Sequence, residues 1–286
     1  MFNVPKAKSD DFNGRFREII SDPLNTFIRR HPFAGHIFDG RVTLHNGLKV
    51  PISGDYAYYG NFSDVLIINR GVHEPLEEFV FQSLLKSLGN QKVTMLELGA
   101  YWGHYSMWLL HERPDSQVVL VEPEKVNLDS GIKNFRDNDF TGQFINDFVG
   151  NGHFSVDSFI SENNLSSLSI LHSDIQGYEV EMLQDTQKAL SNRKIDYLFI
   201  STHSEVLHRE VETIISKFDY DIEVSSSFER HTTSFDGFVF ARKSTLPALF
   251  SGLKFVGRQS IMELTPSERC EYICVLHSSL KQLNLL

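Results

Sequence analysis

From Val93 onward, short apolar runs alternate with segments of helical periodicity, and this rhythm narrows the possible folds more than anything else in the sequence. The runs predicted to be strands are 93–98, 117–121, 142–149, 168–172, 195–201, 222–226 and 237–241. The segments predicted to be helices are 103–111, 124–138, 156–164, 178–191 and 204–218. Right-handed crossovers then permit little besides a mainly parallel sheet with helices on both faces. No helix fits between the last two strands, so the last strand is expected to be antiparallel.

The flanking segments lack this alternation, so the 286-residue chain divides into three parts. Residues 1–90 are predicted to form an N-terminal cap, residues 91–243 the α/β domain, and residues 244–286 a helical C-terminal extension. In the extension, the capping box Thr265-Pro266-Ser267-Glu268 begins an amphipathic helix. Its apolar stripe indicates that this helix packs against the rest of the chain.

The cap contains three predicted elements. A short helix lies near residues 11–20, and Asn46-Gly47 between apolar flanks is typical of a hairpin turn. A lead-in helix over 74–85 carries Pro75 in its first turn, where a missing N–H costs nothing. These elements precede the first strand of the α/β domain.

The first strand of that domain leads into Glu97-Leu98-Gly99-Ala100-Tyr101-Trp102-Gly103. Open parallel sheets bind ligands at the carboxyl ends of their strands. Gly99 lets the chain turn off the strand and, having no Cβ, is expected to leave space for the approach of a ligand. Gly103 begins the next helix close to that ligand. A dinucleotide site would instead require G-x-G-x-x-G, and the rings of Tyr101 and Trp102 would obstruct a diphosphate. The loop therefore favours a ligand without phosphates over NAD, the cofactor of an alternative oxidoreductase function.

Glu122 ends the second strand, 19 residues beyond Gly103. A carboxylate at this position binds both hydroxyls of a ribose and would repel a 2′-phosphate. An adenosyl ligand without phosphates is S-adenosylmethionine. Its cationic sulfonium would find favourable neighbours in Glu97 and in the ring faces of Tyr101 or Trp102.

Four segments, in this order, resemble the FkbM-type S-adenosylmethionine-dependent methyltransferases over roughly residues 65–242. They are His73-Glu74-Pro75, Glu97 to Ser106, Val121-Glu122-Pro123 and His172 to Leu183. The resemblance implies a Rossmann-like class I methyltransferase sheet of seven strands, with Gly103 and Ser106 as part of the cofactor site. It also implies O-methylation of sugars or other small hydroxylated metabolites. The sequence departs from the family at Gln176, where a Glu is usual, and at Ser201-Thr202-His203-Ser204, where a Glu often ends the fifth strand.

Asp174 and His203 are the candidate catalytic residues. Asp174 ends the fourth strand, which is expected beside the first, so its carboxylate would face the transferred methyl group and act as a base. Its alternative role is to cap the helix that starts near Gly177. His203 ends the fifth strand and is the second candidate base. Glu179, one turn into the next helix, is a candidate to orient either His203 or the acceptor, and a solvated or dipole-stabilising role is its alternative. A divalent-metal site made of His172, Asp174 and His203 is a further alternative. His231 and Asp236 lie in the loop between the last two strands, which can reach the site and bind the acceptor, although Asp236-Gly237 is also typical of a simple turn.

Charge and composition limit the partners. A net charge of −10 argues against nucleic acid, and no apolar run approaches the length of a membrane span. The only cysteines, Cys270 and Cys274, indicate free thiols in a reducing cytoplasm. We therefore expect a cytoplasmic enzyme with a small-molecule acceptor, and the sequence leaves open whether it is a homo-oligomer. The alternative is a non-catalytic module that binds an adenosyl ligand for assembly or regulation.

Overall fold

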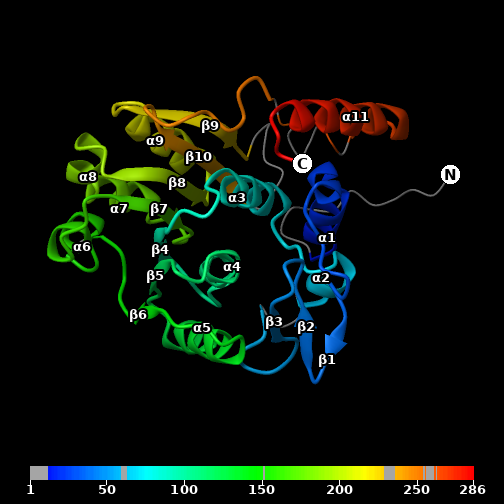
Figure 1. Cartoon of the computed structure of the whole chain (residues 1–286), viewed down its shortest axis with the longest axis horizontal. Coiled ribbons are helices and arrows are strands. Elements are labelled where there is room, and N and C mark those ends of the chain that lie inside the picture. Colours follow the sequence, from blue (N-terminus) through cyan, green and yellow to red (C-terminus); the bar gives the residue numbers. More distant parts are fainter. Residues whose placement is uncertain are drawn as a thin grey trace.

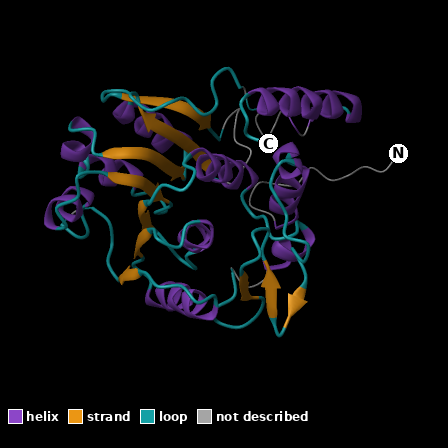
Figure 2. Ribbon diagram, viewed as in Figure 1, coloured by secondary structure: helices purple, strands orange, loops and turns teal. Residues whose placement is uncertain are grey.

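The computed structural model describes residues 12–58, 63–150, 152–228, 236–253, 255, 261 and 263–286. Figure 1 shows a twisted central sheet with helices on both faces. The N-terminal cap lies on the side of one of these two faces. Figure 2 shows that the cap carries a small sheet of its own. In the part of the chain described here, no helix combines the length and apolarity needed to cross a membrane.

The central sheet has seven strands in the order β6-β5-β4-β7-β8-β10-β9. Their bounds are β4 (Thr94–Leu98), β5 (Gln117–Val121), β6 (Gln143–Ile145), β7 (Leu168–Ser173), β8 (Ile195–Thr202), β9 (Tyr220–Ser226) and β10 (Gly237–Lys243). Strand β10 pairs antiparallel with both of its neighbours, and the other pairings are parallel. The predicted Rossmann-like class I methyltransferase sheet, with its last strand antiparallel, is therefore confirmed.

The strands bury both faces, as expected for a parallel sheet between two helical layers. Met95 and Leu96 illustrate this, because these neighbours in β4 belong to two different hydrophobic cores. On the Met95 side lie α3 (Pro75–Ser87), α4 (His104–Glu112) and α5 (Lys125–Asp137). On the Leu96 side lie α6 (Val156–Glu162), α7 (Glu179–Gln184), α8 (Gln187–Ser191) and α9 (Glu205–Ile215).

The cap joins the core on the Met95 side. Besides the lead-in helix α3, which packs on the sheet, its elements are α1 (Phe12–Ser21), the 3-10 helix η1 (Pro23–Thr26), β1 (Ile37–Phe38), β2 (Arg41–Thr43), β3 (Lys49–Pro51) and α2 (Ser63–Ile68). The predicted hairpin is confirmed as β2–β3, and β1 adds a third strand. Asn138, at the end of α5, fixes β3 by two hydrogen bonds of 2.9 Å with the backbone of Lys49.

The C-terminal extension ends in α11 (Pro266–Gln282), which begins with the predicted capping box. Leu276 and Leu280 of this helix are buried in the same core as Phe16 of α1. Figure 1 shows α11 and α1 at the same end of the molecule. The apolar stripe of α11 therefore packs within the chain, as predicted.

Two predicted elements differ from the structure. The helix expected over 178–191 is two helices, α7 and α8. Helix α8 begins anew because the Asp157 carboxylate of α6 accepts the N–H groups of Lys188 and Ala189. The strand expected over 142–149 is only Gln143–Ile145, because β6 lies at the sheet edge and Asn146 instead donates to the backbone oxygen of Glu122.

Candidate active site

Two pockets adjoin at the carboxyl ends of the parallel strands and share Gly99, Tyr101 and Asp174. The pocket on the β5 side, here called the Glu122 pocket, is lined in addition by Glu122, Pro123, Glu124, Asn127, Phe148, Val149, Ile175, Gln176 and Tyr178. The pocket on the cap side, here called the His73 pocket, is lined in addition by Tyr58, His73, Glu74, Glu97, Ala100, Trp102, His104, Tyr105, His172 and Asp236. The Glu122 pocket therefore combines apolar side chains with the carboxyl groups of Glu122, Glu124 and Asp174, and the His73 pocket is polar and aromatic.

Glu122 sits directly after β5 and holds the loop that follows β4. Its Oε2 accepts the backbone N–H of Tyr101 at 3.0 Å, and its Oε1 accepts that of Glu124 at 3.0 Å. Burial raises the pKa of Glu122, and these N–H groups oppose that rise because they favour the ionised form. The Asn127 side-chain amide also donates to Oε1 at 3.3 Å, so of the about four acceptor sites of a carboxylate Glu122 retains one for a further donor.

Gly99 is required by the neighbouring strand. It has a φ of +71°, and a Cβ added to it would lie 1.7 Å from the carbonyl oxygen of Asp174. The sequence suggested instead that this glycine leaves space for a ligand. The structure corrects that reason, because the backbone that follows β7 already fills the space.

The other predicted cofactor residues separate into two groups. Glu97 and Tyr101 line the His73 pocket, and Glu97 accepts the backbone N–H of Ser106 at 3.0 Å. Ser106 is fully buried in α4 and lines neither pocket, so it acts here by holding Glu97. Gly103 precedes α4 with a φ of +74° and packs under the Phe135 ring, away from both pockets.

Asp174 and His203 are brought together as a close pair. Nε2 of His203 lies 3.1 Å from Oδ1 of Asp174, and its Nδ1 lies 2.5 Å from Oε1 of Glu179. Burial alone would lower the pKa of His203, but the hydrogen bonds to Asp174 and Glu179 outweigh it and raise that pKa to about 10. The ring is therefore an imidazolium at neutral pH.

The same contact acts on Asp174 in the opposite direction. Burial would raise the pKa of this carboxyl, but the hydrogen bond and charge of His203 outweigh burial and lower it. Gln176, with a φ of +53°, also donates to Asp174 Oδ1 at 3.2 Å. Tyr178 precedes α7 and no side chain caps that helix, so Asp174 does not take its alternative role as a cap.

Three further expectations concern histidines and the last loop. His172 does not join a divalent set with Asp174 and His203, because its Nε2 pairs with Oε1 of Glu77 at 2.6 Å. Asp236 Oδ1 lies 3.9 Å from Nε2 of His203. His231, also considered for this loop, lies outside the described residues.

The sequence did not point to the acids of α3 and the residue before it. Glu74 accepts the Tyr105 hydroxyl at 2.9 Å, and Glu77 accepts that of Ser201 at 2.9 Å. Burial, together with a neighbouring carboxylate in each case, raises the pKa of Glu74 to about 7 and that of Glu77 to about 8. The available signal was a pair of glutamates, 77 and 78, inside an otherwise apolar helix.

Comparisons with known proteins give distant structural likenesses. No protein-family model matches the chain, and no curated protein matches its sequence. Among solved structures, the bifunctional kinase-methyltransferase WbdD is 13% identical, with 59% of this chain covering 40% of that one at a TM-score of 0.41. This chain therefore spans less than half the length of WbdD.

Two further solved structures match a similar share of the chain. A protein described as an O-methyltransferase of Klebsiella pneumoniae is 15% identical, with 59% of this chain covering 80% of that one at a TM-score of 0.42. The O-methyltransferase TomG of Streptomyces achromogenes, solved with S-adenosylmethionine, is 16% identical, with coverages of 57% and 79% at a TM-score of 0.41. At these scores, no likeness bears on the activity of this chain.

Proposed function

We propose that this chain is an S-adenosylmethionine-dependent methyltransferase that methylates a hydroxyl group of a sugar or another small metabolite. One observation carries the proposal: Asp174 and Gly99 stand where the Glu122 pocket meets the His73 pocket. A cofactor in the first and an acceptor in the second would meet beside the half-buried carboxylate of Asp174. The resemblance to FkbM-type methyltransferases supports the same function.

The residues of the Glu122 pocket fit an adenosyl group. Its walls include Phe148, Val149 and Ile175, which suit the faces of a base. Glu122 keeps one acceptor site for a ribose hydroxyl after accepting two backbone N–H groups and the Asn127 amide. Glu97, buried at the other side of Gly99, offers a carboxylate to a cationic ligand. When bound there, S-adenosylmethionine supplies an electrophilic methyl group.

Asp174 is the residue placed to handle the acceptor's proton. The acceptor oxygen would form a bond to the methyl carbon as the bond from that carbon to the sulfonium sulfur breaks, and the sulfur would keep the electron pair and leave as a neutral thioether. The acceptor's proton would pass to the Asp174 carboxylate, which is ionised at neutral pH. Such general-base help contributes about 10²–10⁴-fold. Alignment of acceptor and methyl group in one line contributes up to about 7–11 kcal/mol.

His203 acts through Asp174 and is therefore a positioning residue. As an imidazolium it cannot accept the acceptor's proton, and it keeps Asp174 ionised instead. Glu179 fixes the other ring nitrogen. Gln176, which stands where the family usually has Glu, adds a neutral donor to Asp174 in place of a further carboxylate.

The test compares binding and turnover in the full chain. Calorimetric titration should show binding of S-adenosylmethionine and of its demethylated product, and no binding of NAD. Transfer of a labelled methyl group should then be measured on a panel of sugars and other hydroxylated metabolites. Binding of NAD in place of S-adenosylmethionine would overturn the cofactor assignment. Tight cofactor binding with no transfer to any hydroxyl acceptor would instead favour the non-catalytic module.

A further inference from the structure

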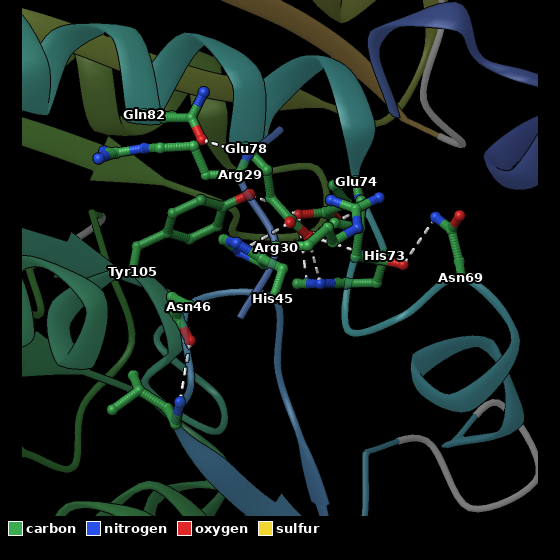
Figure 3. Close-up of polar contacts among 12 residues, drawn as sticks. Arg29, Arg30, His45, Asn46, Asn69, His73, Glu74, Glu78, Gln82 and Tyr105 are labelled. Carbon is green, nitrogen blue, oxygen red and sulfur yellow. Dashed lines mark hydrogen bonds and ion pairs between the residues drawn. The ribbon is translucent and has the colours of Figure 1, made fainter. Parts of the chain in front are cut away.

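A second cluster of polar side chains lies behind the His73 pocket, on the side of the cap. It contains His45 from the β2–β3 turn, Glu78 from α3 and His104 from the first turn of α4. One ligand atom from each residue lies within 4.8 Å of the other two, and all three residues are buried. Figure 3 shows the His45 ring and the Glu78 carboxylate directed toward one another.

Four buried polar atoms of this cluster have no hydrogen-bond partner among the described residues. Among the described residues, neither ring nitrogen of His104 has a hydrogen-bond partner. Nε2 of His45 lies 3.0 Å from Oε2 of Glu78, yet the orientation of the two groups does not form a hydrogen bond. Buried polar atoms almost always find a partner, so each exception requires an explanation.

The Glu78 carboxylate is held so that one oxygen remains available. Its Oε1 accepts the backbone N–H groups of His73 at 2.8 Å and Glu74 at 3.1 Å, and Nδ1 of His73 lies 2.7 Å away. Its Oε2 is the oxygen that faces His45. Neighbours that fix a carboxylate in this way are typical of the outer shell of a metal site.

We infer that His45, Glu78 and His104 bind a divalent transition-metal ion of the zinc class. Imidazole nitrogen and carboxylate oxygen are preferred zinc ligands, and three of them form a common set. Two ligands at zinc distances of about 2.0–2.2 Å stand roughly 3.3 Å apart in a tetrahedron, close to the spacing of His45 and Glu78. His104 also lines the His73 pocket, which gives the ion a path to the site.

The ion would join three segments that are distant in sequence. His45 belongs to the cap, Glu78 to α3, and His104 follows the loop that turns off β4. Trp102 of that loop stacks on the His104 ring, with centroids 5.0 Å apart and planes at 13°. A bound ion would therefore fix the cap against the loop that shapes both pockets, and its role would be structural.

Without an ion, the groups available to balance the negative charge of Glu78 are the imidazoles of His45 and His73 and the guanidinium of Arg30. All three influence the carboxylate electrostatically, and Figure 3 shows them beside it. That arrangement would leave His104 without any partner. The two accounts differ in whether purified protein retains a stoichiometric metal ion.

The experiment uses the full chain without S-adenosylmethionine, so its outcome is independent of the proposed function. Protein stripped with a chelator is titrated with Zn²⁺, and bound metal is measured by elemental mass spectrometry. We expect one Zn²⁺ per chain and a melting temperature that rises when Zn²⁺ is restored. Substitution by Co²⁺ should produce the visible absorption bands of a low-symmetry site.

Two variants and a control define the ligands. His104→Phe keeps a ring against Trp102 and should weaken Zn²⁺ binding at least about 100-fold, the upper end of the cost of losing an outer partner. Glu78→Gln should do the same. His111→Phe, on the exposed part of the same helix, should bind as the wild type does. Wild-type protein that retains no Zn²⁺ at micromolar concentration, or folded His104→Phe that binds it normally, would overturn the inference.

Discussion

His203 is held between two carboxylates, with Asp174 3.1 Å from its Nε2 and Glu179 2.5 Å from its Nδ1. The side chains of His203 and Asp174 are only 14% and 28% exposed, so solvent weakens their attraction little. The pair makes the histidine a fixed cation and the aspartate a fixed anion. This contact is the reason why we assign the role of base to Asp174 and a positioning role to His203.

Asp174→Asn should lower kcat at least tenfold and leave the dissociation constant of S-adenosylmethionine within about threefold. The substitution keeps the shape of the side chain and removes its basicity, which is needed only in the transition state. Steady-state kinetics and calorimetry on one preparation measure both quantities. A fully active Asp174→Asn enzyme would remove the base from the mechanism.

His203→Gln should move the acid limb of the kcat profile to higher pH. His203 lowers the pKa of Asp174, while burial of Asp174 acts to raise it. Without the imidazolium, more alkaline conditions are needed to ionise Asp174. The pH dependence of kcat for the wild type and the variant measures this shift. If the limb stays in place while activity falls, His203 has another role.

His203 should also stabilise the fold in a defined pH window. Its pKa rises from 6.5 to about 10 on folding, so its contribution is fully present below about pH 6.5 and is lost as the pH rises through about 10. The free energy of unfolding, measured in urea at pH 7, 8.5 and 10, should therefore converge for the wild type and His203→Gln. A difference that is constant across this range would contradict the raised pKa.

Glu122→Gln should weaken S-adenosylmethionine binding by about 1–3 kcal/mol, because the charge-assisted hydrogen bond to the ribose is lost. Glu162→Gln, an exposed residue of α6, is the matched control and should bind normally. Because Glu122 also holds the Tyr101 N–H, the melting temperature of each variant must be recorded beside the titration. Unchanged affinity in folded Glu122→Gln would place the ribose elsewhere.

Gly99→Ala should destabilise the protein far more than Gly40→Ala. Both glycines have a φ of +71°, so an alanine at either position carries the same backbone strain of about 1–2 kcal/mol. A Cβ at Gly40 meets nothing within 4 Å, whereas one at Gly99 would lie 1.7 Å from the Asp174 carbonyl oxygen. We expect at least about 3 kcal/mol for Gly99→Ala, measured by chemical denaturation. Equal losses of stability in the two variants would show that the backbone after β7 shifts easily to admit the added Cβ.

The central sheet could be predicted because each of its strands has a signal in its own local sequence. Val119 and Leu120 illustrate this: the run around them is apolar on both faces, as a strand between two helical layers requires. The break between α7 and α8 has no such local signal. It depends on Asp157, about 30 residues earlier, whose carboxylate binds the first N–H groups of α8.

The residues of the candidate site that lie at strand ends could be predicted together with the strands. Asp174, His203 and Glu122 end strands, and strand ends of a parallel sheet meet at one edge. His45 and Glu78 come from the cap and from the face of α3 that packs against it, so no periodic pattern relates them. Their proximity depends on how the cap docks, which is a tertiary property.

The shared core of α1, α3, α4 and α11 has a consequence for how this protein can diversify. Phe16, Phe81, Trp108 and Leu276 all belong to one packed cluster, although they come from the cap, the sheet domain and the extension. An exchange of the cap between related sequences would expose that cluster unless its partners changed at the same time. New acceptor preferences should therefore arise by coordinated substitution across all three segments, and recombination at their borders should yield chains that aggregate.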